Sequence, residues 1–533
     1  MRFGNHSSWK SLSSAVLSAV LLSAAPAIHA QTSTQTSAQS NQNDLTGYWD
    51  LRVPVGDGTY RETFFELQQH GQALTGRIFG RTPQGIPMQG TLTGSAIHLS
   101  TVPIPIGGGG TRPPMVFDGT FEGGKLSIES RNHAGQSTKG DAERSTREAA
   151  MPPAPLPLPA PRDLPDNGLV RTPPMGWNSW NKFAGRITDA DIRSMADAMV
   201  STGMDKLGYL YINIDDTWQL GRDAAGNITM NEKFPNMKAL ADYVHSKGLK
   251  IGIYSSPGPK TCAIYEGSFG HEDQDAKTYA AWGIDYLKYD LCGARAVYSL
   301  SEATERGLYQ KMGEALERTK RPIVYSLCQY GDFDPWKWGA KTSGNLWRTT
   351  GDIEDKWKSM DKIGFSQLAI ASYTRPGRWN DPDMLEIGNG GMNADEYRTH
   401  MSLWSMLSAP LIAGNDLRTM SDETKSILMN KEVIAVDQDP AAKPTQILAG
   451  GSGQPGTVET LWRPMQDGSI IIGIFNRGEQ PTVAGFEWTS LPGGLAGKSR
   501  SARDLWTHQA VPVDGAKFAS TIPAHGVTLL RIH

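Results

Sequence analysis

The stretch from Thr188 to Asp216, TDADIRSMADAMVSTGMDKLGYLYINIDD, joins a helix signal to a strand signal. Thr188 and Asp191 make a capping box at the start of the helix signal. The apolar side chains that follow have the spacing of one helical face: Ile192, Met195, Met199 and Val200. Gly203 stands where a helix commonly ends in a left-handed residue. Residues 209–214 are almost wholly apolar, which is typical of a parallel strand buried on both faces, so the stretch predicts one helix-to-strand step of an α/β fold.

The same step recurs along the chain. Strand candidates follow one another at intervals of roughly 35 to 40 residues, with helical segments between them, at 208–215, 249–255, 284–290 and 321–327. The helical segment 237–247 has the form of the first one, and Gly248 marks its end. About 270 residues of this alternation, within residues 169–440, match the size of an eight-stranded (β/α)8 TIM barrel. A doubly wound open sheet is the alternative architecture.

Two all-β modules flank the predicted barrel. Short strand-like runs divided by Gly, Pro and Asn predict a small antiparallel sandwich or barrel at residues 45–150. Strand-like runs return in residues 441–533 and predict a C-terminal antiparallel β-sandwich. The Pro-rich linker between the first module and the barrel, residues 151–168, predicts an extended polyproline II spacer that holds two bodies apart. The fold class is therefore multidomain, with a central TIM barrel between two β modules.

The start of the chain predicts export. Residues 1–30 combine a basic beginning, an apolar segment and a small-residue site at Ala30, which together indicate a signal peptide. Residues 31–44 are rich in Gln, Ser and Thr and predict a flexible leader. The apolar segment is shorter than the roughly 20 residues that span a bilayer, so no integral membrane protein is expected. The predicted location is secreted or periplasmic.

The charge balance argues against two classes of partner. The chain has 52 Lys and Arg against 55 Asp and Glu, a net charge of −3, so nothing favours a nucleic acid or a membrane surface. A neutral ligand suits this balance. The 15 Trp and 16 Tyr offer flat faces that can stack on sugar rings, although core packing explains most of them. The oligomeric state is left open.

Polar side chains gather where the predicted strands end. The site of a (β/α)8 barrel is built at the carboxyl ends of its strands, so the candidates are the residues found there: Asp215, Asp216, Lys288, Asp290, Arg348, Asp352, Asp381 and Asp383. Any one of them alone is equally well explained as a helix cap or a loop turn. Four groups at four strand ends instead indicate a single acidic site.

Glycoside hydrolysis is a chemistry that needs such a set of acids. A retaining enzyme uses two carboxyl groups, a nucleophile and a proton donor, about 5 Å apart. Clustered aspartates can also bind Mg²⁺, but the sequence has neither a Gly-rich phosphate loop nor a His-x-x-x-His pair, so no metal and no other cofactor is expected. Tryptophans lie among the acids, which favours a sugar: Trp177, Trp180, Trp218, Trp347 and Trp379.

Several long motifs in residues 172–418 resemble those of one known family. They are, in order, Pro174–Trp180, Ile214–Trp218, Tyr286–Cys292, Trp347–Ile353, Arg378–Leu385 and Ala409–Arg418. In these motifs the chain resembles glycoside hydrolase family 27, the α-galactosidase (melibiase) family. The resemblance covers about half of the chain. It implies a retaining exo-glycosidase that removes terminal α-D-galactosyl residues from oligo- or polysaccharides by double displacement.

The resemblance also implies the two catalytic roles. Asp290 takes the place of the nucleophile, and Asp352 that of the general acid/base. Lys288, on the same strand face as Asp290, is expected to keep that carboxylate ionised and to donate to a sugar hydroxyl. Asp352 is expected in a partly desolvated setting that raises its pKa, with Asp383 nearby as a supporting acid.

Further positions that match the family imply a galactose pocket. Asp215 and Asp216 would accept hydrogen bonds from the 4- and 6-hydroxyls of galactose, and Arg348 would reach the 2-hydroxyl. Trp177 and Tyr254 would form the pocket wall. Gln329 stands where the family distinguishes sugars by their 2-substituent, and several α-galactosidases have Glu there. An α-N-acetylgalactosaminidase or a β-L-arabinopyranosidase therefore remains an alternative, as do a non-catalytic carbohydrate-binding protein and a metal-dependent hydrolase.

Three cysteines allow at most one bridge within the chain. The resemblance implies a disulfide between Cys262 and Cys292 at the rim of the pocket, which an exported protein can form. Cys328 would then be a buried free thiol.

Overall fold

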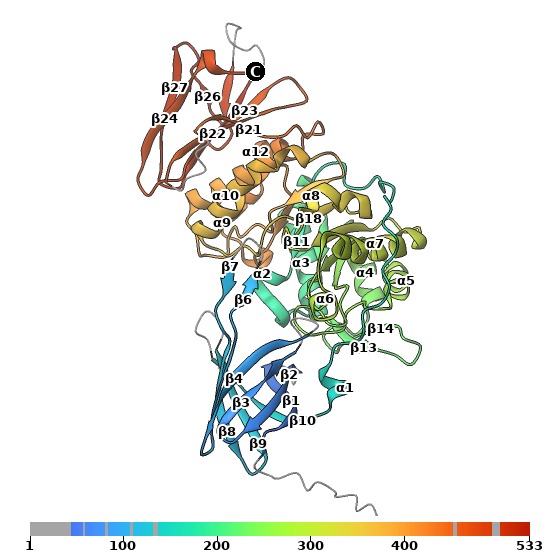
Figure 1. The fold of residues 1–533 in the computed structure, drawn as a ribbon. Helices are drawn as coiled ribbons and strands as arrows, with labels where there is room; N and C mark the ends of the chain where they lie inside the picture. The colour runs from blue at the N-terminus through green and yellow to red at the C-terminus, as the bar shows by residue number, and fades with distance from the viewer. Residues whose placement is uncertain are drawn as a thin grey trace, which may run out of the picture. The chain divides into compact units, whose positions relative to one another are not determined.

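The computed structural model describes residues 44–533 except 57–58, 80–83, 107–109, 132–136, 451–455 and 493–500. The predicted signal peptide and the leader up to residue 43 lie outside the described residues. Among the helices that the structure describes, none is both long enough and apolar enough to cross a membrane. Figure 1 shows an all-β part, an α/β part and a second all-β part in chain order.

The module predicted at residues 45–150 contains a closed antiparallel barrel, one of the two architectures that the sequence left open. Its strands pair in the order β1-β10-β9-β8-β5-β4-β3-β2. Their bounds are β1 (Gly47–Gly56), β2 (Thr59–His70), β3 (Ala73–Ile78), β4 (Ile86–Thr93), β5 (Ala96–Thr101), β8 (Val116–Glu122), β9 (Lys125–Arg131) and β10 (Ser137–Ser145). A hairpin of β6 (Ile104–Ile106) and β7 (Gly110–Arg112) separates β5 from β8 in the sequence, and α1 (Arg147–Ala150) follows β10.

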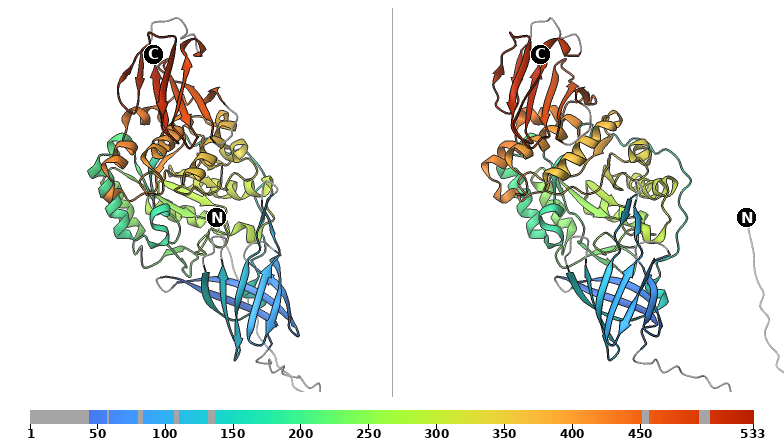
Figure 2. Two further views of the ribbon diagram at one scale, coloured as in Figure 1. Left: turned by 90° about the vertical axis from the view of Figure 1, so that its left-hand side faces the viewer. Right: turned by 60° about the vertical axis from the view of Figure 1, so that its left-hand side comes forward.

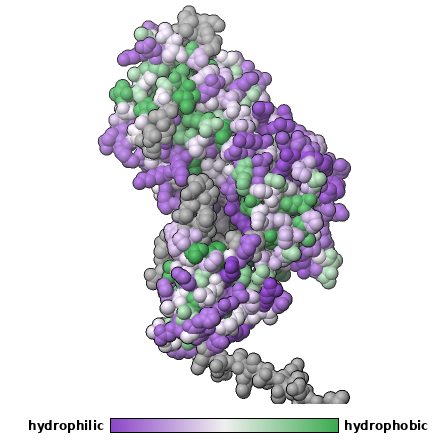
Figure 3. Space-filling model, viewed as in Figure 1, coloured by the Kyte–Doolittle hydropathy of each residue, from purple (hydrophilic) through white to green (hydrophobic). Residues whose placement is uncertain are grey.

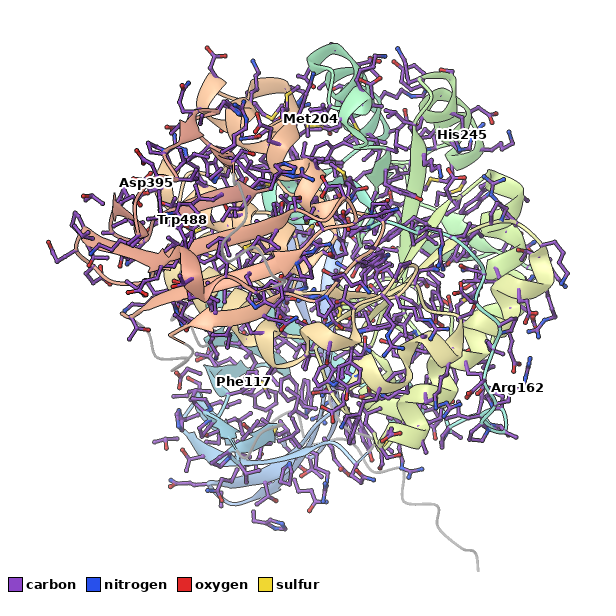
Figure 4. All side chains as sticks on the ribbon, turned by 90° about the horizontal axis from the view of Figure 1, so that it is seen from above. Phe117, Arg162, Met204, His245, Asp395 and Trp488 are labelled. Carbon is purple, nitrogen blue, oxygen red and sulfur yellow. A yellow bond between two sulfur atoms is a disulfide. The ribbon has the colours of Figure 1, made fainter. Side chains whose placement is uncertain are left out.

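Alternating side chains fill the interior of this barrel. Leu74 and Ile78 of β3 are buried between more exposed neighbours, as period-two patterning requires. Phe117, labelled in Figure 4, meets Phe65 edge-on in the same core, with ring centroids 5.3 Å apart. The closed ring leaves no unpaired edge strand, which protects the module from edge-to-edge association.

The Pro-rich segment is extended, but it does not stand free. It runs beside helix α7 (Glu302–Thr319), as the trace in Figure 1 shows. Both backbone groups of Leu156 bond the hydroxyl of Tyr298, at 3.1 and 3.0 Å, and Leu164 is 5% exposed. The Gln310 side chain accepts from the N–H of Arg162, which Figure 4 labels, and donates to the carbonyl of Ala160. The expected free spacer is therefore docked on the α/β part, because its leucines find apolar partners there.

The α/β part is the predicted (β/α)8 barrel. Its parallel strands are β11 (Met175–Asn178), β12 (Tyr211–Asn213), β15 (Lys250–Ser255), β16 (Tyr286–Asp290), β17 (Val324–Cys328), β18 (Leu346–Arg348), β19 (Trp379–Asp381) and β20 (Leu411–Ala413). They pair in the order β19-β18-β17-β16-β15-β12-β11-β20. Leu385, just past β19, bridges to Ala413 of β20 and bonds the carbonyl of Ile412 at 2.8 Å. This bridge joins the two ends of the sheet, so the alternative open sheet is wrong.

Helices surround these strands, as both views in Figure 2 show. They are α2 (Trp180–Phe183), α3 (Asp189–Thr202), α4 (Met237–Ser246), α5 (Glu272–Trp282), α6 (Ala294–Val297), α7, α8 (Pro335–Trp338), α9 (Trp357–Ser366), α10 (Ala394–Leu407), α11 (Asp422–Leu428) and α12 (Lys431–Asp437). Helix α3 has the predicted capping box at Thr188 and ends at Gly203, whose φ is 82°. A hairpin that the sequence did not reveal, β13 (Gln219–Arg222) and β14 (Ile228–Met230), follows β12.

The C-terminal β-sandwich is also as predicted. One sheet contains β21 (Gln446–Ala449), β22 (Val458–Pro464), β23 (Ile470–Asn476), β28 (Val527–Ile532), β25 (Ala502–Asp504) and β26 (Ala510–Val511); the other pairs β24 (Thr482–Glu487) with β27 (Lys517–Ile522). In β23, Ile471 and Phe475 join the core of the barrel, whereas Ile472 belongs to the core of the sandwich. Hydrophobic residues also lie on the surface of this part in Figure 3. Val483 of β24 is 72% exposed.

Candidate active site

The carboxyl ends of the barrel strands bring the predicted charged residues together. Asp215 and Asp216 follow β12, Lys288 and Asp290 end β16, Arg348 ends β18, and Asp383 follows β19. Their exposed fractions are small: Asp215 2%, Asp216 1%, Asp290 4%, Arg348 3% and Asp383 6%. Ionised groups at this depth need partners, because burial without a counter-charge strongly disfavours the charged form. Neighbouring side chains and backbone N–H groups supply those partners through ion pairs and hydrogen bonds.

Asp215 and Lys288 form a buried ion pair. Lys288 Nζ lies 2.7 Å from Asp215 Oδ2, which also accepts a hydrogen bond from the amide of Asn178 at 2.9 Å. Burial lowers the pKa of Lys288, but the nearby carboxylates, Asp215 first, raise it well above its ordinary value. The sequence assigned this lysine to Asp290; in the structure its direct partner is Asp215, and it acts on Asp290 as a neighbouring charge.

Asp216 is held by backbone donors. Its Oδ2 accepts from the N–H of Ala263 at 2.8 Å, and its Oδ1 accepts from the N–H of Thr217 at 2.7 Å. Burial raises the pKa of Asp216 to about 7, against the lowering effect of these bonds. Thr217 has a φ of 84°, a conformation that non-glycine residues adopt only where their surroundings hold them. The carboxylate is thus fixed in place at the end of β12.

Asp290 is the most enclosed of the predicted catalytic pair. Its Oδ1 accepts a hydrogen bond from the hydroxyl of Tyr330 at 2.7 Å and faces the N–H of Cys292 at 3.5 Å. Burial raises the pKa of Asp290, while the charge of Lys288 and the bond from Tyr330 lower it. Asp352 is near enough to contribute a smaller raising effect. The position therefore balances desolvation against an adjacent cation.

Arg348 joins the two remaining acids. One nitrogen, Nη2, lies 3.0 Å from Asp352 Oδ1 and 2.9 Å from Asp383 Oδ2. Asp383 Oδ2 also accepts from the backbone N–H of Ile353, so it fixes the loop that carries Asp352. The expected proximity of Asp352 and Asp383 is found, and the shared guanidinium explains it.

The expected desolvation of Asp352 is wrong. Its side chain is 74% exposed, in the irregular segment that follows β18. Asp352 therefore lies at the solvent-exposed edge of the site, whereas Asp290 is buried.

The residues expected to form the pocket wall are deeply placed. Trp177 is 0% exposed, and its indole N–H donates to the carbonyl of Asn415 at 2.6 Å. Tyr254 is 1% exposed, and its hydroxyl lies 3.0 Å from Cys262 Sγ. Gln329 is 0% exposed, and neither amide atom has a hydrogen-bond partner within the described residues. Trp177 and Tyr254, the expected wall, are therefore buried, and so is Gln329, the residue expected at the 2-position of the sugar.

The predicted disulfide is present. Cys262 and Cys292 are bonded, with their Cα atoms 4.9 Å apart, and Cys328 is a buried free thiol. The sulfur atoms lie 3.7 and 3.6 Å from the hydroxyl of Tyr330. The bridge therefore forms part of the surroundings of Asp290.

Tyr330 is the site residue that sequence reasoning missed. It follows Gln329 in a loop with no strand or helix pattern, and nothing in its neighbours predicts that its ring turns back toward β16. Its left-handed backbone, with a φ of 62°, makes that return possible, and such a conformation is not visible in sequence for a residue other than glycine.

A (β/α)8 barrel with acidic side chains gathered at the carboxyl ends of its strands is an arrangement typical of glycoside hydrolases. The family described as alpha galactosidase A matches residues 172–439, and the family described as alpha galactosidase C-terminal beta sandwich domain matches residues 455–532. The α-galactosidase of Cyamopsis tetragonoloba is 47% identical over 369 residues, which cover 68% of this chain and 87% of that protein.

Solved structures agree with these matches. The crystal structure of α-galactosidase I from Mortierella vinacea is 38% identical, with a TM-score of 0.66, over 69% of this chain and 98% of that one. The α-galactosidase of Saccharomyces cerevisiae with raffinose is 27% identical, with a TM-score of 0.64, over 69% of this chain and 100% of that one. The chain belongs to the α-galactosidase (melibiase) family, glycoside hydrolase family 27.

Proposed function

We propose that the chain acts as an exo-acting α-galactosidase that retains anomeric configuration, with Asp290 as nucleophile and Asp352 as general acid/base. The α-galactosidase activity follows from family membership and from relatives such as the enzyme of Cyamopsis tetragonoloba. The observation that supports the residue assignment is the contrast between the two carboxyl groups: Asp290 is 4% exposed beside a lysine, and the Asp352 side chain is 74% exposed on an arginine.

In the first step, an oxygen of Asp290 attacks the anomeric carbon and the bond to the leaving-group oxygen breaks. Asp352 gives its proton to that oxygen, so no alkoxide is released. In the second step, the Asp352 carboxylate takes a proton from water as the water oxygen bonds to the anomeric carbon. The bond from that carbon to Asp290 breaks as the bond to water forms, and the two inversions leave α-galactose.

The exposure of Asp352 suits both of its tasks. A group that meets the leaving sugar and then a water molecule must face the open side of the site. Arg348 holds its carboxylate in position through a contact of 3.0 Å. Asp383 shares the same guanidinium and completes the support.

Galactosyl oligosaccharides are the expected substrates. The yeast relative was solved with one such sugar, raffinose. Asp215 and Asp216 supply carboxylate oxygens for the 4- and 6-hydroxyls. The bonds already made by these oxygens fix their directions, so a sugar that lacks either hydroxyl loses a hydrogen bond to a buried carboxylate held in place. We expect the side chain of Gln329 to decide which substituent at the 2-position of the sugar the site accepts.

The disulfide supports an extracytoplasmic location. Bridges of this kind persist where the environment is oxidising, and the one between Cys262 and Cys292 forms part of the site. Export by the predicted signal peptide agrees with it.

A panel of p-nitrophenyl glycosides tests the activity. Turnover should be highest on the α-galactoside and much lower on the α-N-acetylgalactosaminide and the β-L-arabinopyranoside. Proton NMR of the first product should show α-galactose before mutarotation, and dialysis against EDTA should leave the rate unchanged. Preference for either alternative sugar, or a β product, would overturn the proposal.

A further inference from the structure

The loop after β17 turns one side chain back onto the proposed nucleophile. Tyr330 lies two residues past the end of β17, and its hydroxyl donates to Asp290 Oδ1 at 2.7 Å. The same hydroxyl contacts both sulfur atoms of the disulfide, at 3.7 and 3.6 Å. The guanidinium carbon of Arg348 lies 5.7 Å from the centre of the tyrosine ring. The two sulfur atoms therefore lie on one side of the hydroxyl, and Asp290 is its one short-range acceptor among the described residues.

The backbone that makes this contact is unusual. Tyr330, Phe333 and Asp334 have φ values of 62°, 54° and 55°, all in the left-handed region that disfavours L side chains. Gly331, with a φ of 83°, has no room for a side chain, because a Cβ there would lie 2.2 Å from the carbonyl of Thr349. Backbone strain of this kind persists only where neighbouring contacts hold it, and it is common at functional sites. Here it serves to direct the Tyr330 ring toward β16.

A donor at this position has a definite chemical effect. One oxygen of a carboxylate nucleophile becomes bonded to the sugar, while the other shares the negative charge of the free carboxylate and becomes the carbonyl oxygen of the ester. A hydrogen bond to Oδ1 stabilises the free carboxylate and fixes its plane, so that Oδ2 is the oxygen presented to the anomeric carbon. Burial and the neighbouring Asp290 both raise the pKa of the Tyr330 hydroxyl, which keeps it protonated and hence a donor.

We propose that Tyr330 is a positioning residue for the nucleophile, and that its hydroxyl orients Asp290 and stabilises its carboxylate before the first step and as the second step releases it. The proposal deepens the proposed function and rests on its assignment of Asp290. Other titratable groups act on Asp290 as well, and they remain when the hydroxyl is removed: Lys288 on β16, Cys328 on β17, Asp352 after β18, Tyr254 on β15 and Tyr309 on α7.

Tyr330→Phe removes the hydroxyl and keeps the ring. We expect kcat/KM on an aryl α-galactoside to fall roughly 10- to 100-fold, the range for losing a hydrogen bond to a charged group. The acid limb of the kcat/KM profile should move up by about one pH unit, because the limb reports the free nucleophile and its carboxylate has lost a stabilising donor. Labelling of Asp290 by 5-fluoro-α-D-galactosyl fluoride should slow in proportion.

A matched control is available on the surface. Tyr243 of α4 also donates its hydroxyl to an aspartate, Asp197, at 2.8 and 2.7 Å from the two oxygens, far from the site in sequence and fold. Tyr243→Phe should leave both the acid limb and the labelling rate unchanged. A purely structural role for Tyr330 would lower the melting temperature of Tyr330→Phe without moving the acid limb, and that result would overturn the proposal.

A second substitution guards against misfolding of the first. Replacing Tyr330 by 3-fluorotyrosine keeps the shape and the hydroxyl but makes the phenol a stronger donor, so the acid limb should move down. An unmoved limb in this variant would count against the proposal even if Tyr330→Phe does not fold. If the wild-type enzyme is labelled at a residue other than Asp290, the nucleophile assignment fails instead, and the two failures are distinguishable.

Discussion

At the scale of single residues, the site depends on two carboxyl groups in opposite surroundings. Asp290 is buried among Lys288, Tyr330 and a disulfide, whereas Asp352 lies in an exposed loop and contacts Arg348. A nucleophile needs a fixed direction and a proton donor needs access, so each environment matches one role. The roles can be separated by how each loss depends on the leaving group.

Asp290→Ala should abolish turnover of every substrate, because no glycosyl-enzyme can form, and added azide should restore activity with a product of inverted configuration.

Asp352→Ala should lose roughly 10² to 10⁴ in rate on natural galactosides and much less on activated aryl galactosides, which need little proton assistance. Its glycosyl-enzyme should accumulate, and azide should release it with retained configuration. Equal losses on both substrate types, or the opposite stereochemistry, would reverse or remove the assignment.

Residue types and strand ends were sufficient to predict most of this site, and the resemblance supplied the roles. They could not predict which charges pair. Lys288 is two residues from Asp290 on one strand, yet it bonds Asp215 of another strand, because pairing depends on the distance between strands. The exposure of Asp352 and the return of Tyr330 both depend on loop conformations, which carry no periodic signal.

At the scale of elements, helix α7 both receives the Pro-rich segment and buries a carboxyl group. Gly307 and Gln310 receive the Pro-rich segment, since a side chain at Gly307 would press on Leu158 at 3.1 Å. The first turn of the same helix buries Glu305, which is 0% exposed and has no hydrogen-bond partner for either oxygen among the described residues. Burial raises the pKa of Glu305 to about 8.

Glu305→Gln should therefore stabilise the protein in a pH-dependent way. A carboxyl whose pKa is higher in the folded state binds its proton more tightly there, so stability falls as pH rises from about 4.5 to about 8. The amide removes that loss. We expect little difference in melting temperature near pH 4.5 and a gain near pH 8.5, on the order of a few kcal/mol in unfolding free energy.

The control for this prediction is Glu302→Gln, a substitution of an exposed glutamate in the same turn. It should show no gain at either pH. A melting temperature for Glu305→Gln that differs from wild type equally at both pH values would mean that Glu305 keeps its ordinary titration.

At the scale of the whole molecule, the barrel and the C-terminal sandwich share a core. Side chains of β22, β23 and β28 belong to the same apolar cluster as α10. Arg477 of the sandwich crosses this boundary: it bonds both oxygens of Asp361 on α9, at 2.6 and 2.9 Å, and Glu459 at 2.6 Å. All three are nearly buried, so the arginine neutralises two carboxylates that water cannot reach.

Arg477→Leu should cost about 3–5 kcal/mol of unfolding free energy, because it leaves two buried carboxylates without a counter-charge. Arg503→Leu breaks a comparable ion pair with Glu432, but Arg503 is 47% exposed, and the expected cost is only about 0–1 kcal/mol. Urea unfolding of the two variants measures the difference. Equal small losses would show that the boundary tolerates the uncompensated charges.

The N-terminal barrel lies outside both family matches, and the Pro-rich segment decides where it can be removed. Removing residues 31–150 should leave kcat on an aryl α-galactoside nearly unchanged, since none of the proposed site residues lies in that module.

Extending the deletion to residue 168 should lower the melting temperature and the yield of folded protein. It strips Leu164 and the backbone partners of Tyr298 and Gln310 from the face of α7, and exposes apolar surface there. The pair of truncations therefore separates the module from the segment that follows it. If the shorter deletion folds but loses most of its kcat, the N-terminal barrel contributes to the active site; if both deletions melt at the wild-type temperature, the docking of the segment adds nothing to stability.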